Sequence, residues 1–137
     1  MCKHLLNITF VLFLIFNCTT CNQESRLPDW AVGTWEGLLG YEHGIEVYPI
    51  KVILNKTGKS QIEYLDQKCV FEIEITSISE HTINLNEKHS KHKCNPFGGG
   101  TIKLDRLDDF GPDLLHMEYY PYGKEELWLA QIEKKEN

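Results

Sequence analysis

The densest group of metal-ligand side chains lies in one polar segment beyond the middle of the chain. His89, His92 and Cys94 fall close together, and His81 precedes them. Imidazole nitrogen and thiolate sulfur are ligands that zinc and copper bind. Two features oppose a metal site, because neighbouring lysines repel a cation and an oxidising compartment would consume the thiolate of Cys94. We therefore expect no metal ion and no other cofactor.

Carboxylates crowd a second polar segment. Asp105, Asp108, Asp109 and Asp113 surround a Phe-Gly-Pro sequence, and paired acids can perform general acid–base catalysis. Aspartate is also common in surface turns, because its side chain hydrogen-bonds the local backbone. A turn is the preferred interpretation, and an enzyme would need these carboxylates to converge in a cleft.

No other arrangement of residues indicates catalysis. No serine or cysteine has a histidine and an aspartate in a plausible order for a nucleophilic triad. The triple glycine at residues 98–100 precedes a predicted strand and lacks the lysine and hydroxyl residue of a phosphate-binding loop. The sequence therefore predicts a protein that is not an enzyme.

Aromatic side chains are the remaining chemical signal. The chain has six tyrosines and three tryptophans, most of which we expect in packing. Tyrosine combines a large apolar face with a hydroxyl, so a subset at one end of the fold could bind a small apolar or sugar-like ligand, or a partner protein. The candidates for such contacts are Tyr48, Tyr64, Tyr119 and Trp128.

The elements that would position these residues are short strands. Runs with apolar residues at every second position recur between turn residues, around Trp35 and at residues 50–54, 62–64, 69–75, 83–85, 102–104, 115–119 and 127–129. A period of two predicts strands with one apolar face, and no helical period of useful length is present. In the last run, Leu127 and Leu129 are taken as the alternating apolar pair.

The fold class predicted from these runs is all-β. About eight short antiparallel strands, each with one apolar face, are best accommodated in a small up-and-down β-barrel, because closure removes exposed edges. A β-sandwich is the alternative, since periodicity does not distinguish the two.

The N-terminus predicts export. Lys3 and His4 precede an apolar run that is too short to cross a bilayer core of about 30 Å as a helix. We expect a signal peptide at residues 1–21, a polar linker at 22–29 and a single β-barrel domain at 30–137.

Two cysteines follow the apolar run and are candidates for lipidation. Cys21 is preferred over Cys18, because residues 21–25 resemble the starts of lipoproteins from AT-rich bacteria. Acylation would place the protein in the cell envelope, at the outer membrane or its periplasmic face, held by an N-terminal lipid anchor. Ordinary cleavage, which would release a secreted protein, is the alternative.

The remaining chain is acidic. Its formal net charge is −6, and removal of the predicted signal, which carries one lysine and no acid, makes it −7. Nucleic acids and anionic membrane surfaces attract clustered Lys and Arg, so neither is an expected partner.

Cys69 and Cys94 are the only cysteines beyond the signal region. A pair in an exported domain predicts a disulfide. Closing that loop of about 25 residues would stabilise the fold by roughly 3.5 kcal/mol through chain entropy.

The segment at residues 31–37 resembles the Gly-x-Trp opening of lipocalins and avidins, which are calycin-type barrels. In those families the glycine lets the chain bend into the first strand and the tryptophan plugs one barrel end, which implies these roles for Gly33 and Trp35. Lipocalins keep an arginine late in the chain that packs over the tryptophan, whereas the final segment here offers Lys134 and Lys135. The biotin-contacting residues of avidins have no match in order.

A module of exported bacterial proteins and kinase ectodomains is similar to a longer set of residues: Tyr48-Pro49-Ile50 with Val52 and Leu54, then Tyr64, Cys69, Cys94 and the strand at 99–104. The resemblance covers most of residues 31–132 and implies that the two cysteines pair. Bacterial metalloprotease inhibitors share the Gly-x-Trp start, a small barrel and one disulfide.

Together these observations predict an exported, non-enzymatic, lipocalin-like binding protein of the cell envelope or extracellular space. Its ligand is a small apolar molecule or a partner protein. A small secreted inhibitor of an extracellular enzyme, of the protease or lysozyme type, is the alternative.

Overall fold

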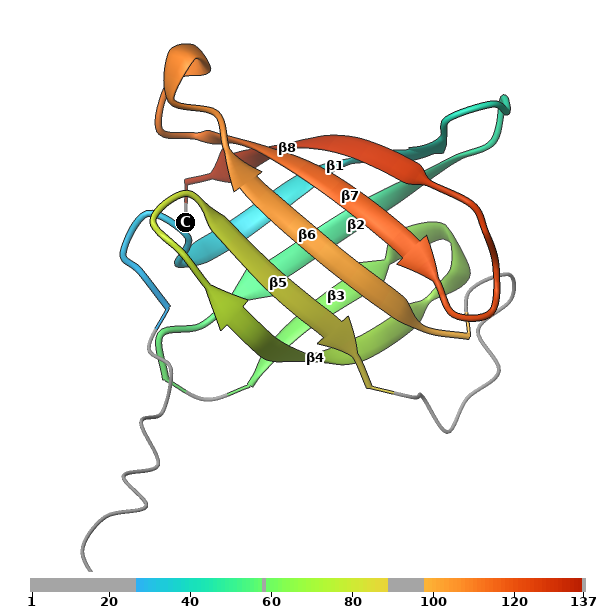
Figure 1. Cartoon of the computed structure of the whole chain (residues 1–137), viewed down its shortest axis with the longest axis horizontal. Coiled ribbons are helices and arrows are strands. Elements are labelled where there is room, and N and C mark those ends of the chain that lie inside the picture. Colours follow the sequence, from blue (N-terminus) through green and yellow to red (C-terminus); the bar gives the residue numbers. More distant parts are fainter. Residues whose placement is uncertain (1–26, 58, 89–97, 137) are drawn as a thin grey trace, which may run out of the picture.

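Eight antiparallel strands close into a barrel (Figure 1). Each strand pairs with the next in the chain, and the last pairs with the first. The strands are β1 (Gly33–Tyr41), β2 (Val47–Leu54), β3 (Ser60–Tyr64), β4 (Cys69–Ile78), β5 (Thr82–Glu87), β6 (Gly100–Arg106), β7 (Leu114–Pro121) and β8 (Trp128–Lys135). The predicted all-β, up-and-down barrel is confirmed, and the sandwich is excluded.

The computed structural model describes residues 27–57, 59–88 and 98–136. The predicted signal peptide, Cys18, Cys21 and the segment from His89 to Cys94 lie outside the described residues. Within the described part, two 3-10 turns accompany the strands, η1 (Leu65–Gln67) and η2 (Asp108–Phe110). No helix there has the length and apolar character needed to cross a membrane.

Large side chains fill the barrel interior. Alternate residues of every strand point inward, and the largest fully buried ones are Trp35, Tyr64, Tyr119, Phe71 and Leu39. Each such side chain contributes about 1.5–3 kcal/mol when it leaves water. Leu27 is also buried, so the core begins before residue 30, the expected start of the domain.

The facing of β8 differs from the prediction by one residue. Trp128, Ala130 and Ile132 are buried, whereas Leu129 lies on the outer surface. The sequence left both choices open, because apolar residues occupy consecutive positions at the start of this strand. Pairing decides between them, since Trp128 lies opposite the inward Tyr119 of β7.

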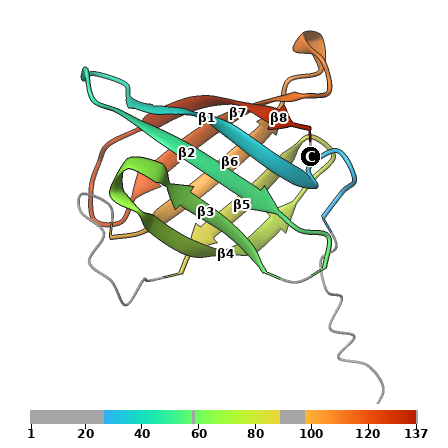
Figure 2. The ribbon, with the colours of Figure 1, turned by 180° about the vertical axis from the view of Figure 1, so that it is seen from behind.

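The two ends of the barrel differ. At the closed end, on the left in Figure 1, lie residues 27–32 and the connections β2–β3, β4–β5 and β6–β7. At the other end, called the aromatic end below, lie the β1–β2 loop, η1 and the β7–β8 loop. Figure 2 shows the same two ends from behind.

Trp35 is fully buried at the closed end. Its indole Nε1 donates a hydrogen bond to the carbonyl of Ala31 at 2.8 Å. The Lys134 ammonium lies over the indole, with Nζ 5.3 Å from the ring centroid, a cation–π arrangement. The final strand thus places a lysine over the tryptophan.

Gly33 makes room for that lysine. Its φ is +142°, and a Cβ there would lie 2.8 Å from Cε of Lys134. Any larger residue would strain the backbone and displace the lysine stem from the indole.

Trp35→Ala should lower the free energy of unfolding by about 3 to 5 kcal/mol, because it empties a packed site and removes the ring beneath Lys134. Urea unfolding followed by circular dichroism measures the change. Trp30→Ala, at a partly exposed ring, is the matched control and should cost less. Equal costs for the two variants would contradict a plugging role for Trp35.

Cys69 begins β4 and packs against the core. Cys94, its predicted partner, lies outside the described residues, so this pairing stays a prediction. Cys69→Ser and Cys94→Ser should each cost about 2 to 5 kcal/mol, because the unfolded chain regains freedom. Thermal unfolding with and without reducing agent tests this, and an unchanged midpoint under reduction would contradict the pairing.

Candidate functional site

The four aromatic residues predicted to contact a ligand or partner gather at the aromatic end. The ring centroids of Tyr48 and Trp128 are 5.5 Å apart, and those of Tyr41 and Trp128 are 5.3 Å apart. Tyr119 lies opposite Trp128 in the β7–β8 ladder, and its ring centroid is 6.4 Å from that of Tyr64. The structure thus brings these residues together, and their binding role stays a prediction.

A carboxyl group that the sequence analysis did not single out is buried beside two of these rings. Glu87, the last residue of β5, is only 2 % exposed. The Tyr64 hydroxyl donates a hydrogen bond to its Oε1 at 2.5 Å, and the Tyr119 hydroxyl donates one to its Oε2 at 3.0 Å. The Tyr122 hydroxyl donates to the Glu87 backbone carbonyl at 3.1 Å. One residue therefore links β3, β5, β7 and the turn after β7.

Burial raises the pKa of Glu87 to about 7. Hydrogen bonds from Tyr64, Tyr119 and the Gly100 backbone favour the charged carboxylate, but burial outweighs them. Burial is also the largest cause of the raised pKa values of Tyr64 and Tyr119, with the nearby Glu87 charge second. At neutral pH both phenols are donors, and Glu87 is divided between its neutral and charged forms.

A carboxyl with a pKa near 7 is suited to general acid–base chemistry. Here, both of its oxygens already accept hydrogen bonds from phenols inside the core. The phenols stay protonated and supply no nucleophile. The arrangement is that of a buried polar network, in which full satisfaction of every group stabilises one set of strand contacts.

Strand alternation could have identified Glu87. Ile83 and Leu85 face inward, so the same parity places residue 87 inside the barrel. A charged residue at an inward position of a predicted strand is a signal that a search for clusters of acids does not register.

The four aspartates around the Phe-Gly-Pro sequence do not converge, because only Asp113 lines the pocket that this segment borders. Asp105 accepts a hydrogen bond from the Thr82 hydroxyl at 2.6 Å and pairs with Lys103 at 2.7 Å. Asp108 pairs with the side chains of Arg106 and His81. These carboxylates belong to separate surface ion pairs. Among the described residues, no three His, Cys, Asp or Glu side chains gather as a metal site.

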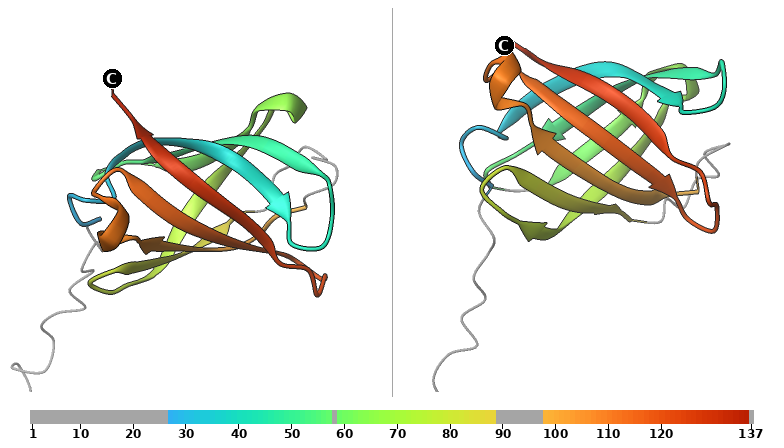
Figure 3. Two further views of the ribbon diagram at one scale, coloured as in Figure 1. Left: turned by 90° about the horizontal axis from the view of Figure 1, so that it is seen from above. Right: turned by 45° about the horizontal axis from the view of Figure 1, so that its top comes forward.

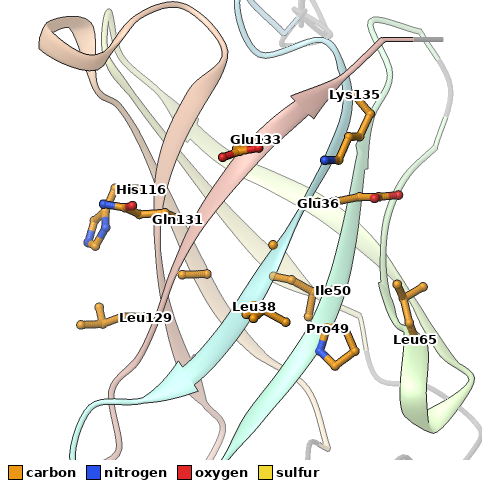
Figure 4. A pocket seen from close by; sticks show the side chains of 12 residues that line it. Glu36, Leu38, Pro49, Ile50, Leu65, His116, Leu129, Gln131, Glu133 and Lys135 are labelled. Atoms are coloured by element: carbon orange, nitrogen blue, oxygen red, sulfur yellow. The ribbon is translucent and has the colours of Figure 1, made fainter.

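An open groove of about 780 Å³ lies on the outer face of β8, β1 and β2 (Figure 4). Its two halves differ in chemistry. Glu36, Glu133 and Lys135 lie toward the closed end, whereas the half toward the aromatic end is lined by aliphatic side chains. The groove therefore combines an apolar surface with a charged border.

The aliphatic half continues onto the neighbouring surface. We call Leu38, Val47, Pro49, Leu65 and Leu129 the outer apolar patch. Leu38 is 59 %, Val47 57 % and Leu65 41 % exposed.

Strand pairing makes the outer apolar patch continuous. Leu38 pairs with Pro49, and Gly40 pairs with both Val47 and Leu129. Gly40 has no side chain to separate its neighbours, and a Cβ there would lie 3.5 Å from a methyl group of Val47.

Exposed hydrophobic residues gather in the half of the barrel nearer the aromatic end. In the described part of the chain they are Leu38, Ile45, Val47, Leu65, Val70, Tyr120 and Tyr122, with Phe110 at the closed end. The outward faces of antiparallel strands are usually polar, and contiguous apolar surface marks an interaction site. The candidate interaction site is therefore on the outer surface of the barrel and not in its interior.

Comparison of the chain with protein-family models, with curated proteins and with solved structures gave no match in any of the three.

The stability of the protein should fall as the pH rises through 7, because folding favours the neutral form of Glu87. Its pKa is about 7 in the folded protein and has an ordinary value of 4.5, so the contribution is complete below 4.5 and lost above 7. The loss amounts to about 3 kcal/mol. Urea unfolding at several pH values measures this loss in the wild type. Glu87→Gln cannot ionise, so its free energy of unfolding should lack this pH dependence.

Glu74→Gln, at an exposed position of β4, is the matched control and should keep the pH dependence of the wild type. A Glu87→Gln variant with an unchanged slope between about pH 4 and about pH 8 would contradict the assignment.

Proposed function

We propose that this chain is an exported, non-enzymatic binding protein that binds a partner protein through the outer apolar patch. The observation that carries the proposal is the contiguous aliphatic surface on the outward face of β8, β1 and β2. Export rests on the predicted signal at residues 1–21, with Cys21 as the preferred lipid attachment site.

A lipocalin-like relationship is part of the proposal. The closed barrel, the Gly-x-Trp opening and the cation over Trp35 support it. The binding mode we propose differs from that of a barrel with a ligand inside. Trp35, Tyr64, Phe71 and Tyr119 occupy interior positions and are fully buried, and two of them hold Glu87. These side chains occupy the space that an interior ligand would need.

The outer apolar patch has the composition of an interface centre. Removal of apolar surface from water contributes about 25 cal/mol per Å², and a few central side chains dominate the affinity of most interfaces. Leu38 and Val47, each more than half exposed, would contribute most when covered. Glu36, Glu133 and Lys135, which lie on the side toward the closed end, would form a polar border that fixes orientation.

Binding agrees better than catalysis with the distribution of acids. The buried Glu87 is enclosed by its phenol donors, and Asp105 and Asp108 are used in ion pairs. Inhibition of an extracellular enzyme is the second candidate. It is favoured by the exposed Ile45 in the β1–β2 loop.

Photo-crosslinking tests the proposal. A benzoylphenylalanine at position 38 should give a discrete adduct with one protein from the envelope or medium of the producing cells. Excess wild-type protein should abolish the adduct, whereas excess Leu38→Lys/Val47→Lys protein should not, because buried lysines oppose binding. The control carries the crosslinker at Phe110, an exposed ring at the closed end, and should give no competable adduct.

The absence of any competable adduct from position 38 would contradict the proposal. A small molecule that co-purifies in native mass spectrometry and survives Leu38→Lys would assign binding to the interior instead.

A further inference from the structure

The loop between β1 and β2 projects beyond the strands that carry it (Figures 1 and 3). Ile45 lies in this loop and is 98 % exposed, more than any other large hydrophobic side chain of the described residues. Val47, which belongs to the outer apolar patch, lies two residues further along the chain, after Glu46. The exposed isoleucine therefore lies close in the chain to the outer apolar patch.

Backbone hydrogen bonds fix the conformation of this loop. The Gly44 amide donates to the Tyr41 carbonyl at 3.2 Å, and the Tyr41 amide donates to the Glu46 carbonyl at 3.4 Å. The Glu42 amide donates to the Leu127 carbonyl at 3.2 Å, which ties the loop to the β7–β8 connection.

Aromatic packing supports the loop from below. Tyr41 and Tyr48, which flank it, both pack on Trp128. A loop held in this way loses little conformational entropy when a partner covers it. It resembles in this respect the preformed binding loops of tight complexes.

Acidic side chains surround the loop. Glu42 and Glu46 flank Ile45 in the chain, and Glu125 and Glu126 lie on the adjoining β7–β8 connection. The cationic side chain of Lys124 pairs with Glu126 at 3.9 Å. The β1–β2 loop and the β7–β8 connection thus carry an excess of negative charge around the apolar Ile45.

This charge distribution indicates a class of partner. An acidic surface repels anionic lipid and nucleic acid and is complementary to a protein rich in Lys and Arg. The tip is convex, so its complement is a concave apolar site such as a substrate cleft.

We propose that the β1–β2 loop inserts Ile45 into an apolar cleft of a basic protein, with Glu42 and Glu46 facing cationic side chains at the rim. The inference rests on the proposed function and names its partner class. The outer apolar patch would extend the same contact, so occupation of the cleft by Ile45 would exclude other ligands of that partner.

The test places the crosslinker at position 45 and compares it with position 38 under the conditions above. Position 45 should give an adduct with the same protein, and that protein should have a basic isoelectric point. The double variant Glu42→Gln/Glu46→Gln should reduce the yield about tenfold, because each lost charge weakens attraction to a basic rim. An increase from about 0.05 M to about 0.5 M sodium chloride should have a similar effect.

Ile45→Ser measures the anchor, and Glu80→Gln, in the exposed β4–β5 connection at the closed end, is the matched charge control. Ile45→Ser should abolish the adduct at position 38, whereas Glu80→Gln should leave it unchanged. Circular dichroism should report the same barrel in all variants, because each altered side chain is exposed.

The outcomes separate the two proposals. Three results would overturn the loop inference and leave the proposed function intact. The adduct from position 38 could persist in Ile45→Ser, its yield could be unchanged in Glu42→Gln/Glu46→Gln, or the captured protein could be acidic. The loss of adducts from both positions 38 and 45 in the otherwise wild-type protein would overturn both.

Discussion

The pairing of β8 with β1 is the constraint on which the rest of the structure depends. It closes the sheet, so that no strand keeps an exposed edge. The close approach requires Gly37, since a Cβ there would lie 2.3 Å from the Gln131 carbonyl oxygen. The same register places Lys134 opposite Trp35 and Leu129 opposite Gly40. One ladder therefore sets both the packing at the closed end and the outer apolar patch.

Glu87 shows the cost and the benefit of a polar group in such a core. Burial opposes its charge and raises its pKa, while the hydroxyls of Tyr64 and Tyr119 satisfy both oxygens. A shift of register by one residue would turn Glu87 outward and leave these phenols buried without it. Since buried polar groups without partners are costly, the network favours the observed register over its neighbours. A leucine would be easier to bury at this position, but it would not favour one register in this way.

The sequence predicted the elements well and the surface poorly, for one physical reason. Alternation within β4 and β7 is local, so the inward faces of Phe71 and Met117 follow from the chain alone. The outer apolar patch is formed by pairing between distant segments, which juxtaposes Leu38, Pro49 and Leu129. Leu129 was also assigned to the wrong face, because both faces of early β8 are apolar. Strand pairing decides which face of such a strand is inward, and the local sequence period does not reveal the pairing.

The two barrel ends differ in what their side chains contact. At the closed end Trp35 is sealed by Lys134, and surface charges pair among themselves, as Arg106 does with Asp108. Such exposed pairs contribute little stability. At the aromatic end, the rings of Tyr41, Tyr48 and Trp128 pack together beneath the β1–β2 loop. The apolar side chain of that loop, Ile45, is exposed to solvent. Stability alone would favour a polar residue at the tip, and the exposed isoleucine there agrees with the proposed contact through this loop.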